Sequence, residues 1–252
     1  MKEIFMKNLG NIEADFEQQL DQIRGISDVH EETQEFVLGF VDGFKNSLLV
    51  SLNDPSKKEF DKMRTQIERI KDHKKIKEKY NIIYSQSLVL LVSAFESAMN
   101  EVFKFIINEK SSLISWPVDK KKIQIDVSEL GDETTTPGDL VLKAFKENVN
   151  FQNPDSTLRF CSEYLKLGIP FSELSQLKFF FMLRHVVAHN GSKVDTQLIG
   201  SAKNADRSIP RKGSLVEVRD HDYLEADRLV RSFFSSIVSA VKQKIDNDPY
   251  LG

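Results

Sequence analysis

One arginine and two histidines lie within six residues of one another in the segment Arg184-His185-Val186-Val187-Ala188-His189. The apolar residues before them predict a helix that ends at Asn190-Gly191, because both residue types readily adopt the left-handed conformation that closes helices. On this helix His185 and His189 are four residues apart and face the same way. Arg184 is rotated by about 140° from His189, a gap that a long arginine side chain can close.

These residue types suit the cleavage of RNA by its own 2′-hydroxyl group. His189 falls in the last turn of the predicted helix, where the helix dipole favours a protonated imidazole. Arg184 offers planar, permanently charged donors that match phosphate oxygens. An acid–base group beside a phosphate-binding cation is what this reaction requires, and its product carries a 2′,3′-cyclic phosphate. The spacing alone is also typical of surface or capping residues.

The histidine pair could instead bind a metal ion, but such a site needs a third or fourth ligand and the sequence offers no cluster that supplies one. The chain contains no Gly-rich phosphate loop, no paired cysteine motif, no nucleophile elbow and no HExxH segment. We therefore expect neither a metal nor another cofactor. The other three histidines lie in polar contexts and are expected at the surface: His30, His73 and His221.

The segment from Arg184 to His189, followed by Asn190-Gly191, resembles the RxxxxH motif of HEPN domains, in which the histidine is followed by Asn or Gly. A second likeness is an earlier apolar helix that carries a glutamate, here Glu96 within LVLLVSAFESAMNEVFKFI. The resemblance covers residues 80 to 246. His185 departs from the family pattern, which more often has Asn or Asp at that position.

This resemblance implies a metal-independent endoribonuclease of the toxin, RNA-processing or anti-phage defence type. His189 is then the general acid or base, Arg184 stabilises charge on the phosphate, and His185 assists in proton transfer or positioning, with Asn190 supporting the site. HEPN nucleases bring two motifs together, so the resemblance also implies a homodimer. RNA is the expected substrate, and an antitoxin or defence-system protein is an expected partner.

Two other interpretations stay open. HEPN modules without cleavage activity share the same bundle, so the chain could be a non-catalytic module that binds RNA, a nucleotide or a partner protein. It could also be a helical scaffold in which the motif is accidental. Convergence of Arg184 and His189 on an open cleft would separate the scaffold from the other two.

Further charged residues could support the site. Glu96 lies on an apolar helix stripe, so its carboxylate either pairs with Arg184 or His189, or reaches solvent at the edge of the stripe. A polar segment after the motif helix carries four basic residues, which either contact RNA or form an ordinary solvated loop. These are Lys203, Arg207, Arg211 and Lys212.

Apolar residues at steps of three and four predict the helices that position these groups. They run over residues 9–25, 36–49, 88–106, 139–148 and 156–167. Another helix begins at the capping box of Ser56 and Glu59, and either continues unbroken into the apolar stretch or bends near residues 77 to 85. The motif helix is capped by Ser172, and the last helix opens at Asp222. Such helices bury their stripes only against each other, which predicts an all-α antiparallel helical bundle, HEPN-like in the interpretation above.

A small β-hairpin is the one predicted exception, pairing residues 122–127 with residues 214–219. A length of 252 residues favours a single domain over residues 1–252. Its core is expected at about residues 80–246, with an N-terminal helical extension over 1–80 and an insertion over 111–168.

Composition narrows the class of protein further. A formal net charge of −3 argues against a broad nucleic-acid-binding surface and leaves room for a local basic patch. The single cysteine, Cys161, suits a reducing compartment, so we expect a cytoplasmic protein. No stretch approaches the ~20 uninterrupted apolar residues of a membrane span, so no membrane association is expected.

Overall fold

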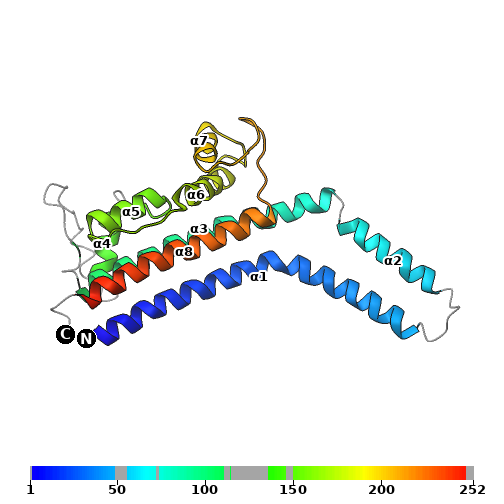
Figure 1. Ribbon diagram of the computed structural model, residues 1–252, viewed down its shortest axis with the longest axis horizontal. Helices are drawn as coiled ribbons and strands as arrows, with labels where there is room; N and C mark the ends of the chain where they lie inside the picture. Colours follow the sequence, from blue (N-terminus) through cyan, green and yellow to red (C-terminus); the bar gives the residue numbers. More distant parts are fainter. Residues whose placement is uncertain are drawn as a thin grey trace.

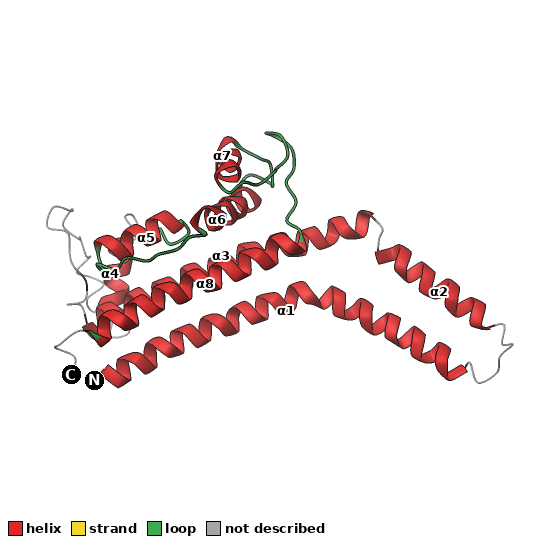
Figure 2. Cartoon of the chain, in the orientation of Figure 1, coloured by secondary structure: helices red, strands yellow, loops and turns green. Residues whose placement is uncertain are grey.

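Helices make up the regular structure of this chain. The computed structural model describes residues 2–48, 56–71, 74–110, 114, 136–145 and 150–247, and within these ranges it contains helices and no β-strand (Figure 1, Figure 2). In chain order the helices are α1 (Lys2–Leu48), α2 (Ser56–Lys71), α3 (Lys74–Lys110), α4 (Pro137–Phe145), α5 (Pro154–Glu163), α6 (Leu174–His189), α7 (Thr196–Asn204) and α8 (Asp220–Asp246). The predicted all-α fold class is confirmed.

Three long helices, α1, α3 and α8, lie side by side and form the body of the bundle (Figure 1). The start of α1 meets the ends of the other two, since Phe5 packs on Phe105 with ring centroids 4.4 Å apart and Lys2 Nζ lies 2.9 Å from Asp246 Oδ1. Helix α1 is therefore antiparallel to both α3 and α8. Helices α4 to α7 cover one side of this body.

The core lies where the predicted apolar stripes meet. Helix α8 buries the whole predicted set, namely Leu229, Val230, Phe233, Phe234, Ile237, Val238, Val241 and Ile245. Phe234 contacts Phe16 of α1 at 4.3 Å between ring centroids, and Phe233 stacks on Phe95 of α3 at 5.6 Å. Apolar burial of this extent is the main stabilising contribution to the bundle.

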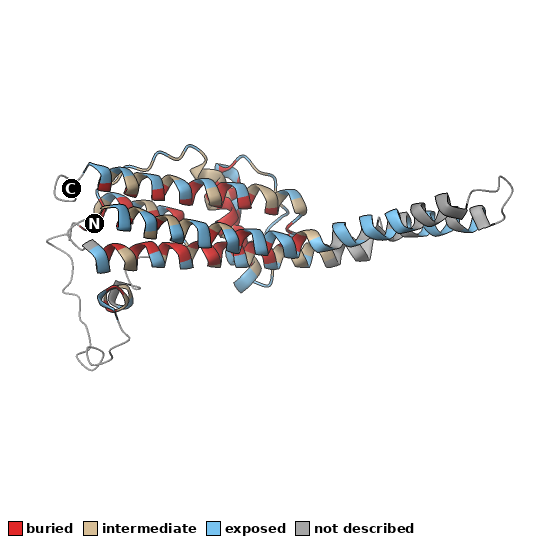
Figure 3. Cartoon of the chain, turned by 90° about the horizontal axis from the view of Figure 1, so that it is seen from below, coloured by how far each residue is buried: buried red, intermediate tan, exposed pale blue. Residues whose placement is uncertain are grey.

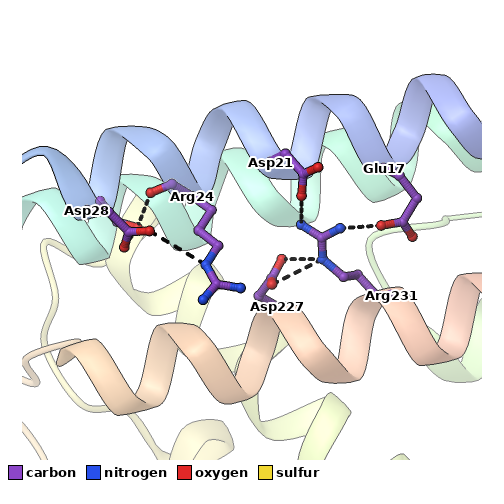
Figure 4. Close-up of polar contacts among 7 residues, drawn as sticks. Glu17, Asp21, Arg24, Asp28, Asp227 and Arg231 are labelled. Carbon is purple, nitrogen blue, oxygen red and sulfur yellow. Dashed lines mark hydrogen bonds and ion pairs between the residues drawn. The ribbon is translucent and has the colours of Figure 1, made fainter.

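A polar cluster joins α1 to α8 at the edge of this core (Figure 4). Arg231 contacts Glu17, donates from Nη2 to Asp21 Oδ1 at 2.9 Å, and donates from Nε to both oxygens of Asp227 at 3.1 Å. Asp227 is only 4% exposed, and burial raises the pKa of its carboxyl group. One guanidinium thus holds carboxylates from two helices together.

The second half of α1 and the whole of α2 project beyond the bundle as a two-helix arm, defined here as residues 26–48 and 56–71 (Figure 1). The predicted break between residues 25 and 36 is wrong, because α1 continues through Gly25 as one helix of 47 residues. A glycine inside a helix costs about 1 kcal/mol relative to alanine, too little to end a helix that is anchored in a core. The predicted start of α2 at Ser56 is confirmed.

Several predicted boundaries need correction. Helix α2 ends at Lys71 and a separate helix, α3, begins at Lys74 and continues through residues 77–85, so neither the single long helix nor the bend near residues 77 to 85 is observed. Part of the segment interpreted as a polar loop is helix α7, whose first turn is capped by Asp195 Oδ1 accepting from the Leu198 N–H at 2.8 Å. Helix α8 begins at Asp220, because Asp222 accepts from the Arg219 N–H at 3.1 Å from inside the first turn.

The predicted pairing of residues 122–127 with residues 214–219 stays a prediction, because the structure describes only the second of these segments. Residues 122–127 lie outside the described residues. On the other side, Leu215 forms an isolated antiparallel bridge with Lys193. The backbone of 213–216 is instead bonded to residues 192–194, which follow the motif helix.

The predicted division into extension, core and insertion also differs from the structure. Phe5, Leu9 and Phe16 belong to the main core, so the first half of α1 is part of the bundle and only the arm extends from it. Phe151 and Phe160, inside the predicted insertion, are also core residues.

Helix α4 approaches α3 closely at Gly138, in its first turn. A Cβ atom added there would lie 2.7 Å from the Lys104 carbonyl oxygen, so only glycine permits this approach.

Within α3, the stretch Tyr80–Glu109 is long and apolar enough to cross a membrane by length and composition alone. Half of its most apolar window is buried inside the bundle. A core helix meets the same criterion, and α3 contacts α1, α4, α6 and α8.

Candidate active site

The motif lies at the C-terminal end of α6, and this helix ends at the residues predicted to end it, Asn190 and Gly191. Asn190 is the C-cap and its N–H donates to the Val186 carbonyl at 3.0 Å. Gly191 adopts a φ of +57°, which an L side chain rarely tolerates, and the Ser192 N–H donates to the same carbonyl at 3.1 Å. At the other end, Glu173 takes the cap position predicted for Ser172, without a side-chain capping bond.

Helix α6 places its charged motif residues on different sides. Arg184 is 8% exposed and lies on the buried side of the helix with Phe180 and Leu183. His185 and His189 are exposed, and their ring centroids are 5.0 Å apart. The two histidines therefore come together as predicted.

Arg184 does not close the gap to His189. Its Nη1 donates to Gln152 Oε1 at 2.8 Å, and among the described residues no hydrogen bond or ion pair joins it to either histidine. The rotation of about 140° around the helix sets this outcome, since burial of the α6 side that carries Arg184 directs the guanidinium toward the bundle. The expected convergence of Arg184 and His189 on an open cleft is thus not observed within one chain, so this criterion does not set the nuclease and binding interpretations apart from a helical scaffold.

Gln152 links Arg184 to Glu96. Its Nε2 donates to Glu96 Oε2 at 2.5 Å while its Oε1 accepts from Arg184. Glu96 is neither directly paired with the motif nor simply directed to solvent, so the structure replaces both predicted alternatives with a bridge. The Nε of Arg184 is buried and has no hydrogen-bond partner among the residues that the structure describes.

Local structure holds Gln152 in place from both sides. The Gln152 N–H donates to Asn150 Oδ1 at 2.8 Å, and the next residue, Asn153, caps α5 by accepting from the Asp155 N–H at 2.9 Å. Phe151 is buried and packs against Phe160 with ring centroids 5.4 Å apart. Sequence reasoning missed Gln152; the run Asn153-Pro154-Asp155 signals a helix start and could have placed a fixed turn there.

Asn190 has a role at the end of the motif helix. Its Nδ2 donates to Asp195 Oδ2 at 2.8 Å, and Asp195 in turn caps α7. The side chain therefore ties the end of α6 to the start of the next helix. Asn190 therefore helps to fix the end of the helix that carries His189, and its amide group bonds to Asp195.

The four basic residues predicted to bind RNA divide into two groups. Arg207 forms ion pairs with Asp222 and Glu225, and its guanidinium carbon lies 4.5 Å from the centre of the Phe180 ring. It is therefore engaged within the chain. The other three are exposed, namely Lys203, Arg211 and Lys212.

Backbone contacts carry two of these exposed residues close to the end of α6. The turn at Arg211 and Lys212 is followed by Gly213, whose N–H donates to the Val194 carbonyl at 2.8 Å. The Val216 N–H donates to the Ser192 carbonyl at 2.8 Å. A pocket of about 420 Å³ lies under this loop and is lined in part by Phe179, Leu183, Arg207 and His221. It includes neither Arg184 nor the two motif histidines.

Within the described ranges, no group of three or more His, Cys, Asp or Glu side chains is placed to hold a metal ion. No family model matches the chain, and no curated protein or solved structure matches it significantly. No relative therefore indicates a ligand or a function for Arg184, Gln152 and the two histidines.

Proposed function

We propose that the chain is a metal-independent endoribonuclease that cleaves RNA by attack of a 2′-hydroxyl group on the adjacent phosphate. The observation that carries this proposal is the buried guanidinium of Arg184, which is held by Gln152 and whose Nε donor has no partner within the described part of the chain. A buried donor without a partner costs about 1–3 kcal/mol. A phosphate oxygen would satisfy this donor and balance the charge, which a neutral amide cannot do.

The two exposed histidines supply the proton transfers. One imidazole removes the proton of the 2′-hydroxyl group, and a protonated imidazole returns a proton to the departing 5′-oxygen. The P–O5′ bond breaks as the P–O2′ bond forms, so the products are a 2′,3′-cyclic phosphate and a 5′-hydroxyl group. Exposed Lys203, Arg211 and Lys212 would hold the backbone of the RNA next to the end of α6.

Assembly into a homodimer completes the proposal. Within one chain the histidines and Arg184 lie on different sides of α6, whereas a second copy can approach the exposed histidines without unfolding any element. A symmetric pair would bring two exposed His189 side chains to one RNA. A role as toxin, RNA-processing enzyme or anti-phage defence protein, in the cytoplasm and with a regulating partner protein, follows from the resemblance to HEPN nucleases alone.

The decisive experiment compares wild type with His189→Ala and His221→Ala on total RNA in the presence of EDTA. His221 is an exposed histidine outside the motif and serves as the matched control. We expect wild type and His221→Ala to release fragments with 2′,3′-cyclic phosphate ends, and His189→Ala to be slower by at least about 100-fold, as for loss of a general acid or base. Activity that requires added Mg²⁺ or Mn²⁺ would overturn the mechanism.

A second function is favoured by the separation of Arg184 from the histidines. In this alternative the chain binds RNA or a nucleotide phosphate through Arg184 and does not cleave it. Binding of labelled RNA, measured against salt concentration, would then fall in Arg184→Ala and stay unchanged in His189→Ala. This binding pattern, together with absence of cleavage by wild type, His189→Ala and His221→Ala, would establish the alternative.

A further inference from the structure

The solvent face of α1 changes character where the helix leaves the bundle. Beside the bundle this face is polar and exposed, with Asp15, Gln18, Gln19 and Gln22. In the arm the same face carries exposed apolar side chains, namely Ile26, Val29, Phe36, Val37 and Phe40. Four of these, Ile26, Val29, Phe36 and Phe40, have exposed fractions of 53 to 74%. Figure 3 shows that the described part of the arm is largely exposed.

The positions of these side chains fit a helix–helix contact. Ile26, Val29, Thr33, Phe36 and Phe40 are spaced by three, four, three and four residues, the heptad spacing of a coiled-coil stripe. At about 100° per residue, this stripe lies roughly opposite the core stripe that runs from Phe5 to Ser27. The bundle therefore cannot cover it. A contiguous apolar stripe of this kind marks an interaction surface more often than chance exposure.

Charge indicates which helix the stripe would accept. The segment 26–40 contains Asp28, Glu31, Glu32 and Glu35 and no Lys or Arg, so two such stripes would repel each other. Helix α2 has the opposite balance, with six Lys or Arg residues and three Asp or Glu residues. Its exposed residues include Lys58, Lys62 and the apolar Met63. Glu59 and Asp61 are also exposed near Met63, and Glu59 pairs with Lys62, but α2 keeps a net positive charge that complements the acidic α1 stripe.

We propose that the arms of two copies of this chain pack together, with the α1 stripe of each copy against α2 of the other. Such a contact is isologous, because α1 meets the partner's α2 twice around one two-fold axis. It places acidic residues against basic ones at both contacts. This interface does not depend on the nuclease proposal, since it uses no residue of the motif.

The first test measures the mass of the full-length chain in solution by light scattering and sedimentation. Val29→Ser combined with Phe36→Ser changes only exposed positions, so circular dichroism should remain that of wild type. We expect a dimer for wild type and a dissociation constant raised at least about tenfold for this variant. The matched control is Ile4→Ser with Leu90→Ser, two exposed apolar residues outside the arm, which should dimerise like wild type.

The second test exchanges charges between helices. Lys58→Glu with Lys62→Glu makes α2 acidic, and Glu32→Lys with Glu35→Lys makes the α1 segment less acidic. Each variant alone should dimerise at least about tenfold more weakly, and an equal mixture of the two should recover the dimer. A mixture no better than its components would overturn the pairing of α1 with α2. A monomeric wild type, a dimer untouched by the arm variant, or equal weakening by the control would overturn the interface itself.

Discussion

Gln152 Oε1 accepts a hydrogen bond of 2.8 Å from Nη1 of Arg184, a residue 32 positions further along the chain. The same amide donates to Glu96, so one side chain joins α3, the turn before α5 and α6. An amide can accept and donate at once, which neither a carboxylate nor an ammonium can do. The orientation of the Arg184 guanidinium therefore depends on a residue outside the motif.

Gln152→Leu should weaken both the fold and the site. Loss of the amide leaves a buried donor of Arg184 unsatisfied, which should lower the free energy of unfolding by about 1–3 kcal/mol. RNA cleavage should fall more than this destabilisation explains, with kcat affected even under conditions where the variant is fully folded. Urea denaturation and single-turnover cleavage measure the two effects. Glu96→Gln is the control, since it keeps an acceptor for Gln152 Nε2 and should behave nearly like wild type.

Arg184→Lys should be strongly impaired although it keeps the positive charge. A lysine cannot donate to Gln152 and also present a second, planar donor to a phosphate oxygen. We expect kcat/KM for RNA to fall at least about 100-fold, with a smaller change in the midpoint of thermal unfolding. Steady-state cleavage of a defined RNA measures this, and near-normal rates would show that the phosphate-binding group lies elsewhere.

Mixing inactive chains into wild type tests whether two motifs form one site. If each site needs His189 from both copies, a mixed dimer is inactive, and activity should fall with the square of the wild-type fraction. Cleavage is measured after the chains have been allowed to exchange with increasing His189→Ala protein. A decline in simple proportion to dilution would assign both proton transfers to His185 and His189 of one chain.

The Arg231 cluster should make stability depend on pH through Asp227. Burial raises the pKa of this carboxyl group above its ordinary value, against the opposing effect of Arg231. The folded state therefore binds the proton more tightly than the unfolded state, and stability falls as pH rises from below the ordinary pKa through the raised one. Relative to Asp227→Asn, wild type should lose unfolding free energy across the weakly acidic range.

Urea denaturation at a series of pH values measures that difference. Asp21→Asn is the matched control, because Asp21 is an exposed partner of the same arginine, and surface ion pairs contribute about 0–1 kcal/mol. A difference between wild type and Asp227→Asn that is constant with pH would contradict the prediction, as would one that grows in favour of wild type.

Local signals in the sequence predict local structure well in this chain. Asn190-Gly191 ends α6 and Ser56 starts α2, because caps are determined by the residues that form them. The buried side of α8 is predicted correctly from its apolar periodicity, since this periodicity shows which side is buried whatever helix packs against it. Gly25 gives a wrong prediction, because the cost of a glycine inside a helix is outweighed here by core contacts made elsewhere along α1.

The candidate site was harder to predict, since it depends on contacts between distant segments. The spacing of His185 and His189 is a property of one helix and is reproduced in the structure. The direction of Arg184 depends on which side of α6 is buried, and its partner Gln152 comes from a turn with no motif of its own. The sequence did not predict the ion pairs of Arg207, because its carboxylate partners, Asp222 and Glu225, lie on a separate helix, α8.

The continuity of α1 has a mechanical consequence. Its 47 residues follow a helical path of about 70 Å that starts in the core, bends where it leaves the bundle and ends in the arm (Figure 1). No loop separates the two halves of α1, so continuous helical hydrogen bonds join the arm to the bundle. The cluster around Arg231 fixes α1 to α8 before α1 leaves the core. A displacement of the arm would therefore act first on the contact between α1 and α8 at Arg231.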